Sequence, residues 1–288
     1  LADLDEALRL EPGLQSARNI RGVVRRVRGE WDRALADFDE AIRLDPADAD
    51  ALRNRAAVHT AKRDFDRALA DLDASLKLEP ANVESLLRRA GIRAERGDLD
   101  RTHADAQRAI ELNAKAPDGF NLRGWVRLQR KEYDTALADF SQALRLNPRH
   151  LPALVNRITV WSVKKDHART VADLELHAQL APANAQYRLI GLLRFYLGRY
   201  AESAEALTQE LRAKPGDHYS AIWRYLAQAR AGDEPGARKN LAQAAQSLPG
   251  GKWPAAAVGF YLGKGTEPVM QKAADDMRFE KAAAGLLP

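Results

Sequence analysis

Apolar residues recur at helical spacing in blocks of similar length along most of the chain. In residues 15–48, apolar positions between Ile20 and Val27 predict a first helix over about 15–28. Gly29 suits the left-handed residue that commonly ends a helix. A second helix beginning near Asp32 and ending at Pro46 places the following residues on one face: Ala34, Leu35, Phe38, Ala41, Ile42 and Leu44. The unit is therefore a helix, a turn and a helix.

Prolines set the register of this unit along the chain. They follow a spacing of 34 residues, with Ala114 at the one missing position and a one-residue deletion after Pro182: Pro12, Pro46, Pro80, Pro148, Pro182, Pro215 and Pro249. This register predicts an array over residues 1–249, made of a half repeat at 1–14 and seven repeats, followed by a degenerate helical capping repeat at 250–288. The seven repeats are 15–48, 49–82, 83–116, 117–150, 151–183, 184–217 and 218–249, numbered 1 to 7 below.

The repeat resembles the tetratricopeptide repeat (TPR) family, in its bacterial type. Family positions 8, 17, 20, 24, 27 and 32 are filled in repeat 4 by Gly124, Tyr133, Ala136, Phe140, Ala143 and Pro148. The resemblance covers about residues 1–249 and implies an all-α, right-handed superhelical solenoid. The stretch from Trp253-Pro254 to Gly263 is weakly similar to the tail of some bacterial TPR lipoproteins. The alternative is a capping repeat that covers the last apolar face.

Two charged columns run through the repeats. Position 7 is arginine and position 23 is aspartate in five consecutive repeats, which places together Arg21 and Asp37, Arg55 and Asp71, Arg89 and Asp105, Arg123 and Asp139, and Arg157 and Asp173. Both charges are lost together in repeat 6, at Ile190 and Ala206. We therefore predict a hydrogen-bonded Arg–Asp pair inside each of the five repeats. The alternative is a ladder of arginines that binds phosphates or carboxylates.

Composition and charge argue against catalysis and against nucleic acid. The chain has 45 Lys and Arg among 40 Asp and Glu, interspersed rather than clustered, so we expect no nucleic-acid binding. Cysteine is absent, and none of the histidines has a metal-binding spacing: His59, His103, His150, His167, His177 and His218. We expect no cofactor, no catalytic residue and no enzyme activity. No run of 18 apolar residues predicts a membrane span.

By the family resemblance, first helices line the concave face at positions 2, 5, 6, 9 and 12. In repeats 1–3 these positions include polar and charged residues: Ser16, Asn19, Arg26, Asp50, Arg53, Asn54, Glu84 and Arg88. From repeat 4 the face becomes apolar and aromatic with interleaved amides and a hydroxyl. We predict that a partner binds there, at Asn121, Trp125, Leu128, Val155, Asn156, Thr159, Leu192, Phe195, Ile222 and Trp223. The alternative is that these residues pack against neighbouring repeats or the C-terminal tail.

These observations favour a non-enzymatic scaffold that binds a peptide or protein segment in the concave groove, with self-association as a further option. The family's carboxylate clamp, which grips the C-termini of chaperones, is missing from the corresponding positions. The alternative function is an accessory region of a larger enzyme whose catalytic domain lies elsewhere. The chain opens on Leu1 inside a repeat, as expected for a fragment. Cytoplasm and periplasm both fit, with a lipid anchor if a signal precedes the fragment.

Overall fold

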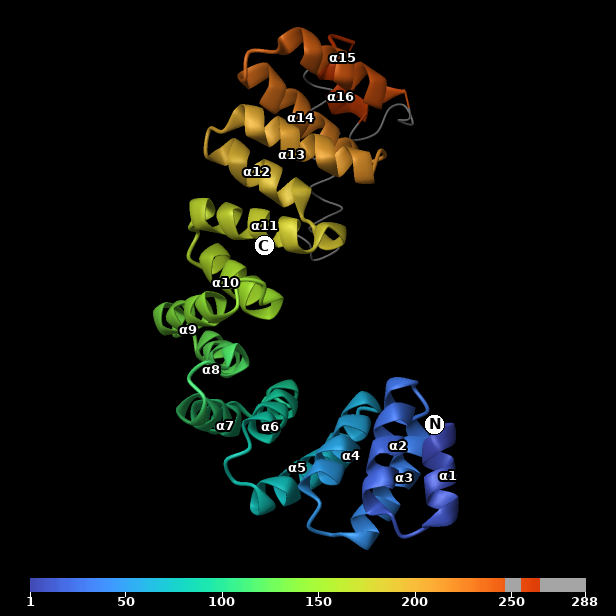
Figure 1. The fold of residues 1–288 in the computed structure, drawn as a ribbon. Helices are drawn as coiled ribbons and strands as arrows, with labels where there is room; N and C mark the ends of the chain where they lie inside the picture. Colours follow the sequence, from blue (N-terminus) through green and yellow to red (C-terminus); the bar gives the residue numbers. More distant parts are fainter. Residues whose placement is uncertain (247–254, 265–288) are drawn as a thin grey trace. The chain divides into compact units, whose positions relative to one another are not determined.

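A computed structural model describes residues 1–246 and 255–264, and this part of the chain is helical throughout, with no β-strand (Figure 1). The chain divides into two compact units, unit 1 at Leu1–Val160 and unit 2 at Trp161–Pro288. Each is described by itself. None of the helices in residues 1–246 and 255–264 is long and apolar enough to cross a membrane.

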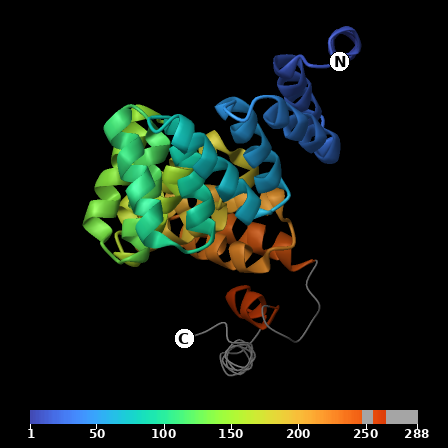
Figure 2. The same cartoon turned by 90° about the horizontal axis from the view of Figure 1, so that it is seen from below.

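Unit 1 contains the half repeat and the first four complete repeats. Its helices are α1 (Ala2–Leu10), α2 (Gln15–Val27), α3 (Trp31–Leu44), α4 (Ala49–Ala61), α5 (Phe65–Leu78), α6 (Val83–Glu95), α7 (Leu99–Leu112), α8 (Pro117–Gln129), α9 (Tyr133–Leu146) and most of α10 (Leu151–Val163). The two helices of a repeat pack against each other, as α2 does with α3 and α4 with α5 (Figures 1 and 2). The predicted helix-turn-helix unit is confirmed.

Unit 2 continues the same alternation. Its helices are α11 (His167–Leu180), α12 (Tyr187–Tyr196), α13 (Tyr200–Ala213), α14 (His218–Arg230), α15 (Glu234–Ala245) and α16 (Ala255–Tyr261), with a short 3₁₀ segment at Pro182–Asn184. Ala257 and Val258 of α16 pack against Tyr225 and Leu241 of repeat 7. The second helix predicted from Pro268 to Ala284 and the dipeptide Trp253-Pro254 lie outside the described residues.

The turn inside a repeat depends on one residue in the left-handed conformation. Gly29 has a φ of 75°, and the following amide of Glu30 donates to the Arg25 carbonyl at 2.9 Å. The predicted left-handed helix end is therefore confirmed. Repeats 2 and 4 place Arg63 and Lys131 at the same point, with φ of 60° and 61°. Those two turns take a conformation that costs a residue with a side chain more than it costs glycine.

Small residues and one ring form the core of repeat 1. Ala34, Phe38 and Ala41 are fully buried, and a Cβ added at Gly22 would lie 2.6 Å from the Phe38 ring. The two helices approach closely because position 8 carries no side chain there. Trp31, the aromatic residue at position 17 of repeat 1, is 39% exposed and does not fill the core as Phe38 does. At the first residue of α3 its side chain lies at the edge of the helix pair.

Four of the predicted Arg–Asp pairs are present in unit 1, so the prediction is confirmed for repeats 1–4. The Arg–Asp N–O distances are 2.6 Å for Arg21–Asp37, 2.6 Å for Arg55–Asp71, 2.7 Å for Arg89–Asp105 and 2.6 Å for Arg123–Asp139. The four aspartates are only 3–6% exposed. The arginines are consequently occupied inside the repeats, unlike a ladder that binds phosphates. The fifth pair, Arg157 with Asp173, stays a prediction.

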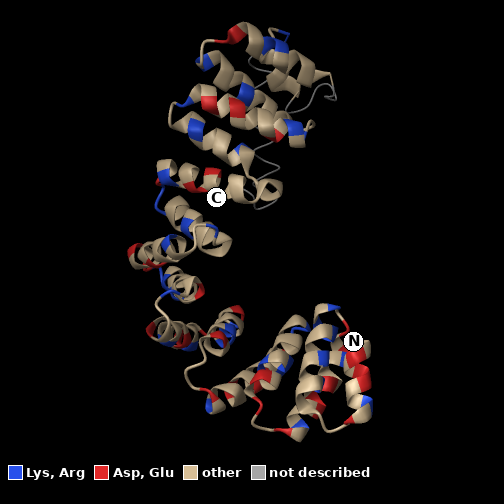
Figure 3. Cartoon of the chain, viewed as in Figure 1, with Lys and Arg blue, Asp and Glu red and all other residues tan. Residues whose placement is uncertain are grey.

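Each of these arginines also has a polar partner on the second helix of the preceding repeat. Arg55 donates to Asp39 and Arg89 to Asp73, at 2.8 Å and 2.7 Å, while Arg123 donates to the amide oxygen of Gln107 at 2.6 Å. The column therefore links neighbouring repeats as well as the two helices of one repeat. Figure 3 shows the resulting mixture of basic and acidic residues over the helices of each unit.

Candidate functional site

The first helices of neighbouring repeats touch one another in unit 1. Contacts join α2 to α4 and α6 to α8, in addition to those inside each repeat. Side chains at the predicted partner-facing positions of these helices therefore share one surface, which we call the inner face. It is built from α2, α4, α6, α8 and the unit 1 part of α10.

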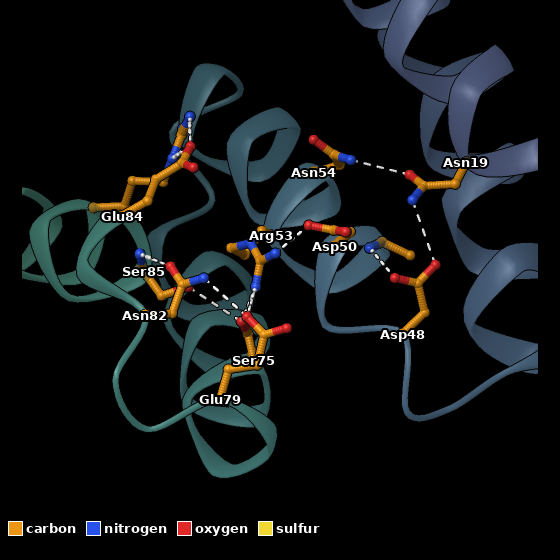
Figure 4. Close-up of polar contacts among 12 residues, drawn as sticks. Asn19, Asp48, Asp50, Arg53, Asn54, Ser75, Glu79, Asn82, Glu84 and Ser85 are labelled. Atoms are coloured by element: carbon orange, nitrogen blue, oxygen red, sulfur yellow. Dashed lines mark hydrogen bonds and ion pairs between the residues drawn. The ribbon is translucent and has the colours of Figure 1, made fainter. Parts of the chain in front are cut away.

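At the N-terminal end of the inner face, polar side chains bond to one another. The amide nitrogen of Asn54 donates to Asn19 Oδ1 at 3.0 Å, and Asn19 lies beside Asp48 (Figure 4). Arg53 donates to Glu79 at 2.6 Å and also to Asp50. The sequence predicted that polar and charged residues line the concave face here. The charge of Arg53 is largely neutralised within the face, because each of its terminal nitrogens has a carboxylate partner.

A second asparagine pair repeats this arrangement further along the inner face. Asn156 Nδ2 on α10 donates to Asn121 Oδ1 on α8 at 3.0 Å. Across the described residues this is the one side-chain hydrogen bond that either amide makes. Both side chains are half-buried, so an N–H and an oxygen remain for a ligand. Paired amides held in a fixed orientation suit the alternating donors and acceptors of a peptide backbone.

A hollow of about 620 Å³ lies between α6 and α8 on the same face. Its volume falls within the range typical of ligand-binding clefts. Its wall mixes apolar and polar groups, formed by Val83, Glu84, Leu87, Arg88, Asn113, Ala116, Asp118, Asn121 and Leu122. Asn121 belongs both to this hollow and to the asparagine pair. The amide pair and the hollow are therefore parts of one surface.

Charged groups at the hollow are held in place by neighbours. Arg88 pairs with Glu84 at 2.7 Å on α6. Asp118 on α8 lies 3.0 Å from His150 Nε2, and this hydrogen bond holds the pKa of Asp118 below its ordinary value. The hollow therefore presents two carboxylates and one guanidinium at neutral pH, each with a protein partner.

His150 was not among the residues predicted to matter for the site. Its Nδ1 accepts from the backbone N–H of Ala153 at 3.1 Å at the start of α10. Because Nδ1 accepts, Nε2 carries the proton and donates to Asp118. Asp48 and Asn82 cap α4 and α6 at the same repeat position. Because His150 occupies this same repeat position, the sequence could have predicted that it caps α10.

The other predicted residues of unit 1 lie around the amide pair. Trp125 and Leu128 on α8 are half-buried, and Val155 is 45% exposed. Thr159 is exposed, but its hydroxyl donates to the Val155 carbonyl at 3.0 Å. The surface thus has apolar side chains beside two partly free amides, while Thr159 is mainly bonded to its own helix.

The predicted residues of unit 2 form a separate surface. Phe195 and Trp223 stack edge to face with 5.1 Å between ring centroids, and Leu192 is half-buried. Ile222 is different, because it is buried against the core formed with Leu241 and neighbouring residues. Ile222 therefore packs against a neighbouring helix, which is the alternative that the sequence left open for these positions. The two sets of residues belong to different units.

Metal chemistry has no visible site in the part of the chain that the structure describes. Residues 1–246 and 255–264 contain no group of three or more His, Asp or Glu side chains placed to hold a metal ion.

Comparison with known proteins agrees with the helical repeat architecture. Residues 22–62 match a family model described as TPR repeat, and residues 117–150 match one described as tetratricopeptide repeat. The helix-turn-helix period extends the same unit on both sides of these matches. The chain therefore contains tetratricopeptide repeats, and proteins with these repeats generally mediate contacts between proteins. No curated protein matches the chain.

Solved structures similar to the chain are also repeat proteins. The chain is similar to pilF of Pseudomonas aeruginosa, with 22% identity, a TM-score of 0.61, and coverage of 79% of this chain and 99% of that one. It is similar to a tetratricopeptide repeat protein of Parabacteroides merdae, with 16% identity, a TM-score of 0.56, and coverage of 87% and 98%. YrrB, a TPR protein with an unusual peptide-binding site, shares 18% identity at a TM-score of 0.52, with coverage of 68% and 97%. These likenesses show the fold.

Proposed function

We propose that this chain is a non-enzymatic scaffold whose unit 1 inner face binds an extended segment of a partner protein. The observation that carries the proposal is the position of Asn121. It lines the hollow between α6 and α8 and also accepts a hydrogen bond from Asn156. An extended segment lying across α6, α8 and α10 would place its backbone at the two amides and a side chain in the hollow.

Apolar side chains beside the asparagine pair would also contact the partner segment. Trp125, Leu128 and Val155 lie on the first helices next to the amide pair, and tryptophan is a frequent centre of binding energy at interfaces. Polar amides fix the register of the bound backbone, and the apolar side chains provide area to bury. The surface formed by Leu192, Phe195 and Trp223 in unit 2 is a second docking surface in this proposal. Ile222 supports it from the core.

The test begins with peptides selected for binding to the full chain from a random library. Asn121→Ala and Asn156→Ala should each weaken the selected peptides about tenfold, since each removes a hydrogen bond from a partly buried interface. Trp125→Ala should weaken them further. Asn184→Ala, at an exposed position in the other unit, is the matched control and should leave the affinity unchanged.

Binding is measured by isothermal titration calorimetry, and thermal melts confirm that each variant is folded. A double variant of Asn121 and Asn156 should lose less than the sum of the two single losses, because the amides bond to each other. Selected peptides that bind both single variants as tightly as the original chain would place the binding surface elsewhere.

A further inference from the structure

The arginine at position 7 has two partners in the repeats of unit 1. Arg123, for example, donates to Asp139 on the second helix of its own repeat and to Gln107 on the second helix of the preceding one. Arg55 and Arg89 follow the same rule with two aspartates each. At this position the guanidinium is enclosed between helices and its charge is met by a carboxylate.

Repeat 7 of unit 2 keeps the arginine and lacks the carboxylate. Arg224 lies at position 7 of α14, while position 23 on α15 is Asn240. The Asn240 side chain donates to Gln228 at 3.1 Å and does not turn toward Arg224. Thr208 stands where the preceding repeat would supply its partner, and its hydroxyl donates to the Ala204 carbonyl at 2.7 Å. In unit 1 these two positions supply side-chain hydrogen-bond acceptors to the arginine. In repeat 7 the side chains of Asn240 and Thr208 do not accept from Arg224.

The Arg224 guanidinium is left with weak contacts. Its one hydrogen bond with the described residues runs from a terminal nitrogen to the Asn240 backbone carbonyl at 3.4 Å. Its buried Nε has no acceptor among the residues that the structure describes. Burial also lowers the pKa of Arg224, which is the direction expected for a cation taken from water without a counter-charge. An enclosed arginine in this state gains from an anion more than an exposed one does.

The space for such an anion is present beside the side chain. A cavity of about 300 Å³ is lined by Leu211, Pro215, Arg224, Asn240, Gln243 and Ala244. Arg224 is the one charged residue of this lining, and Asn240 and Gln243 add amide groups. In repeat 6 the same position is filled by Ile190, which is buried, so a side chain without charge fits there. Packing alone does not require an arginine at position 224.

We propose that Arg224 and the cavity beside it bind a carboxylate, in the place that Asp139 and its equivalents occupy in unit 1. A carboxylate accepts two parallel hydrogen bonds from a guanidinium, which matches the geometry of the Arg–Asp pairs elsewhere in the chain. The ligand class is a carboxylate-bearing molecule, either a small free acid or an acidic side chain of a peptide. The site lies in unit 2 and is independent of the peptide surface proposed for unit 1.

The experiment follows the arginine Nε–H signals of the full, ¹⁵N-labelled chain by NMR in chloride-free buffer. Loss of one signal in Arg224→Ile identifies Arg224. Titration with glutarate or with a capped Ala-Glu-Ala peptide should shift that signal and leave the Arg123 signal in place. A response to glutarate alone indicates a free acid, and a tighter response to the peptide indicates an acidic side chain. No shift of the Arg224 signal with either probe would overturn the proposal.

Asn240→Asp provides the second variant, because it restores the carboxylate at position 23. It should raise the melting temperature of unit 2 and weaken the response of the Arg224 signal to both probes by about tenfold or more. Asn184→Asp adds the same charge at an exposed position. It should change neither the melting temperature nor the response of the Arg224 signal. Unchanged carboxylate binding in Asn240→Asp would show that the probes act elsewhere, and a lower melting temperature would show that Arg224 is already satisfied.

Discussion

Unit 1 and unit 2 use the same repeat but join their helices with different chemistry. In repeats 1–4, buried aspartates at position 23 hold arginines of the first helix, and several accept a second arginine one turn later, as Asp139 does from Arg127 at 2.8 Å. In repeat 6 the corresponding residues are Ile190 and Ala206, both buried. Also in unit 2, Phe195 forms edge-to-face ring contacts with Tyr200 and with Trp223 of repeat 7.

The contrast shows that the 34-residue repeat fixes the backbone more strictly than it fixes the type of side-chain contact between the helices. A buried ion pair is directional and depends on both partners, so losing one partner leaves a charge without compensation. Apolar and aromatic contacts are less directional and tolerate partial loss. We therefore expect unit 1 to be more sensitive than unit 2 to single changes at its helix contacts. The following substitutions test that expectation.

The largest effect is expected from Asp139→Ala. The substitution removes the carboxylate shared by Arg123 and Arg127 and leaves both guanidinium groups in a mostly buried setting. We expect a loss of about 3–5 kcal/mol in the free energy of unfolding, measured by urea denaturation followed by circular dichroism. Glu40→Ala removes an exposed pair with Arg43 and serves as the control, with no shift of the transition. An unchanged midpoint for Asp139→Ala would mean that the pair adds nothing.

A smaller effect is expected where the two helices of a repeat meet at glycine. A Cβ at Gly124 would lie 2.8 Å from the Phe140 ring, and one at Gly191 would lie 2.6 Å from Leu207. We expect Gly124→Ala to cost about 1–3 kcal/mol. Gly191→Ala should cost less, because the Leu207 side chain is smaller than a ring and can shift with less disturbance of its neighbours.

Thermal melts of both variants measure this difference between the units. Gly91→Ala is the matched control, since a Cβ at Gly91 meets nothing within 4 Å. On helix α6 it should stabilise the chain by about 0.5–1 kcal/mol. If Gly124→Ala and Gly191→Ala lose the same stability, the contact with Phe140 is no more rigid than the contact with Leu207.

The smallest effect is expected in the ring cluster of unit 2. Phe195→Leu keeps most of the apolar volume but removes the edge-to-face contacts with Trp223 and Tyr200. We expect a loss of about 0.5–1.5 kcal/mol. A double-mutant cycle with Trp223→Leu, followed by thermal melts, isolates the coupling between the two rings. A coupling near zero would assign their contribution to burial alone.

Much of the local structure was readable from the sequence. The spacing of apolar residues gave the helix pairs, with α2 at Gln15–Val27 close to the predicted 15–28. The joint presence of Arg and Asp at positions 7 and 23 identified their pairing, because residues that vary together across copies of one hairpin face each other. Local rules suffice here, since both partners lie within a single repeat.

The candidate site could be predicted only in part from the sequence. Asn121, Asn156 and Trp125 were selected from their repeat positions, but nothing in the pattern indicated that the two amides bond to each other. Arg53 was placed on the concave face by its repeat position, but its pairing with Glu79 and Asp50 could not be predicted from that position. Side-chain rotamers settle such questions, and they depend on the neighbouring repeat.

The sequence by itself determined the repeat length, the all-α fold and the Arg–Asp pairs of repeats 1–4, because these depend on helix periodicity and on contacts within one hairpin. Tertiary structure decided which polar groups stay available. Asn156 meets Asn121 across 35 residues, and Ile222, which was predicted to bind a partner, is buried. Stacking of successive repeats sets these outcomes, because it fixes the distance between residues that no single repeat brings together.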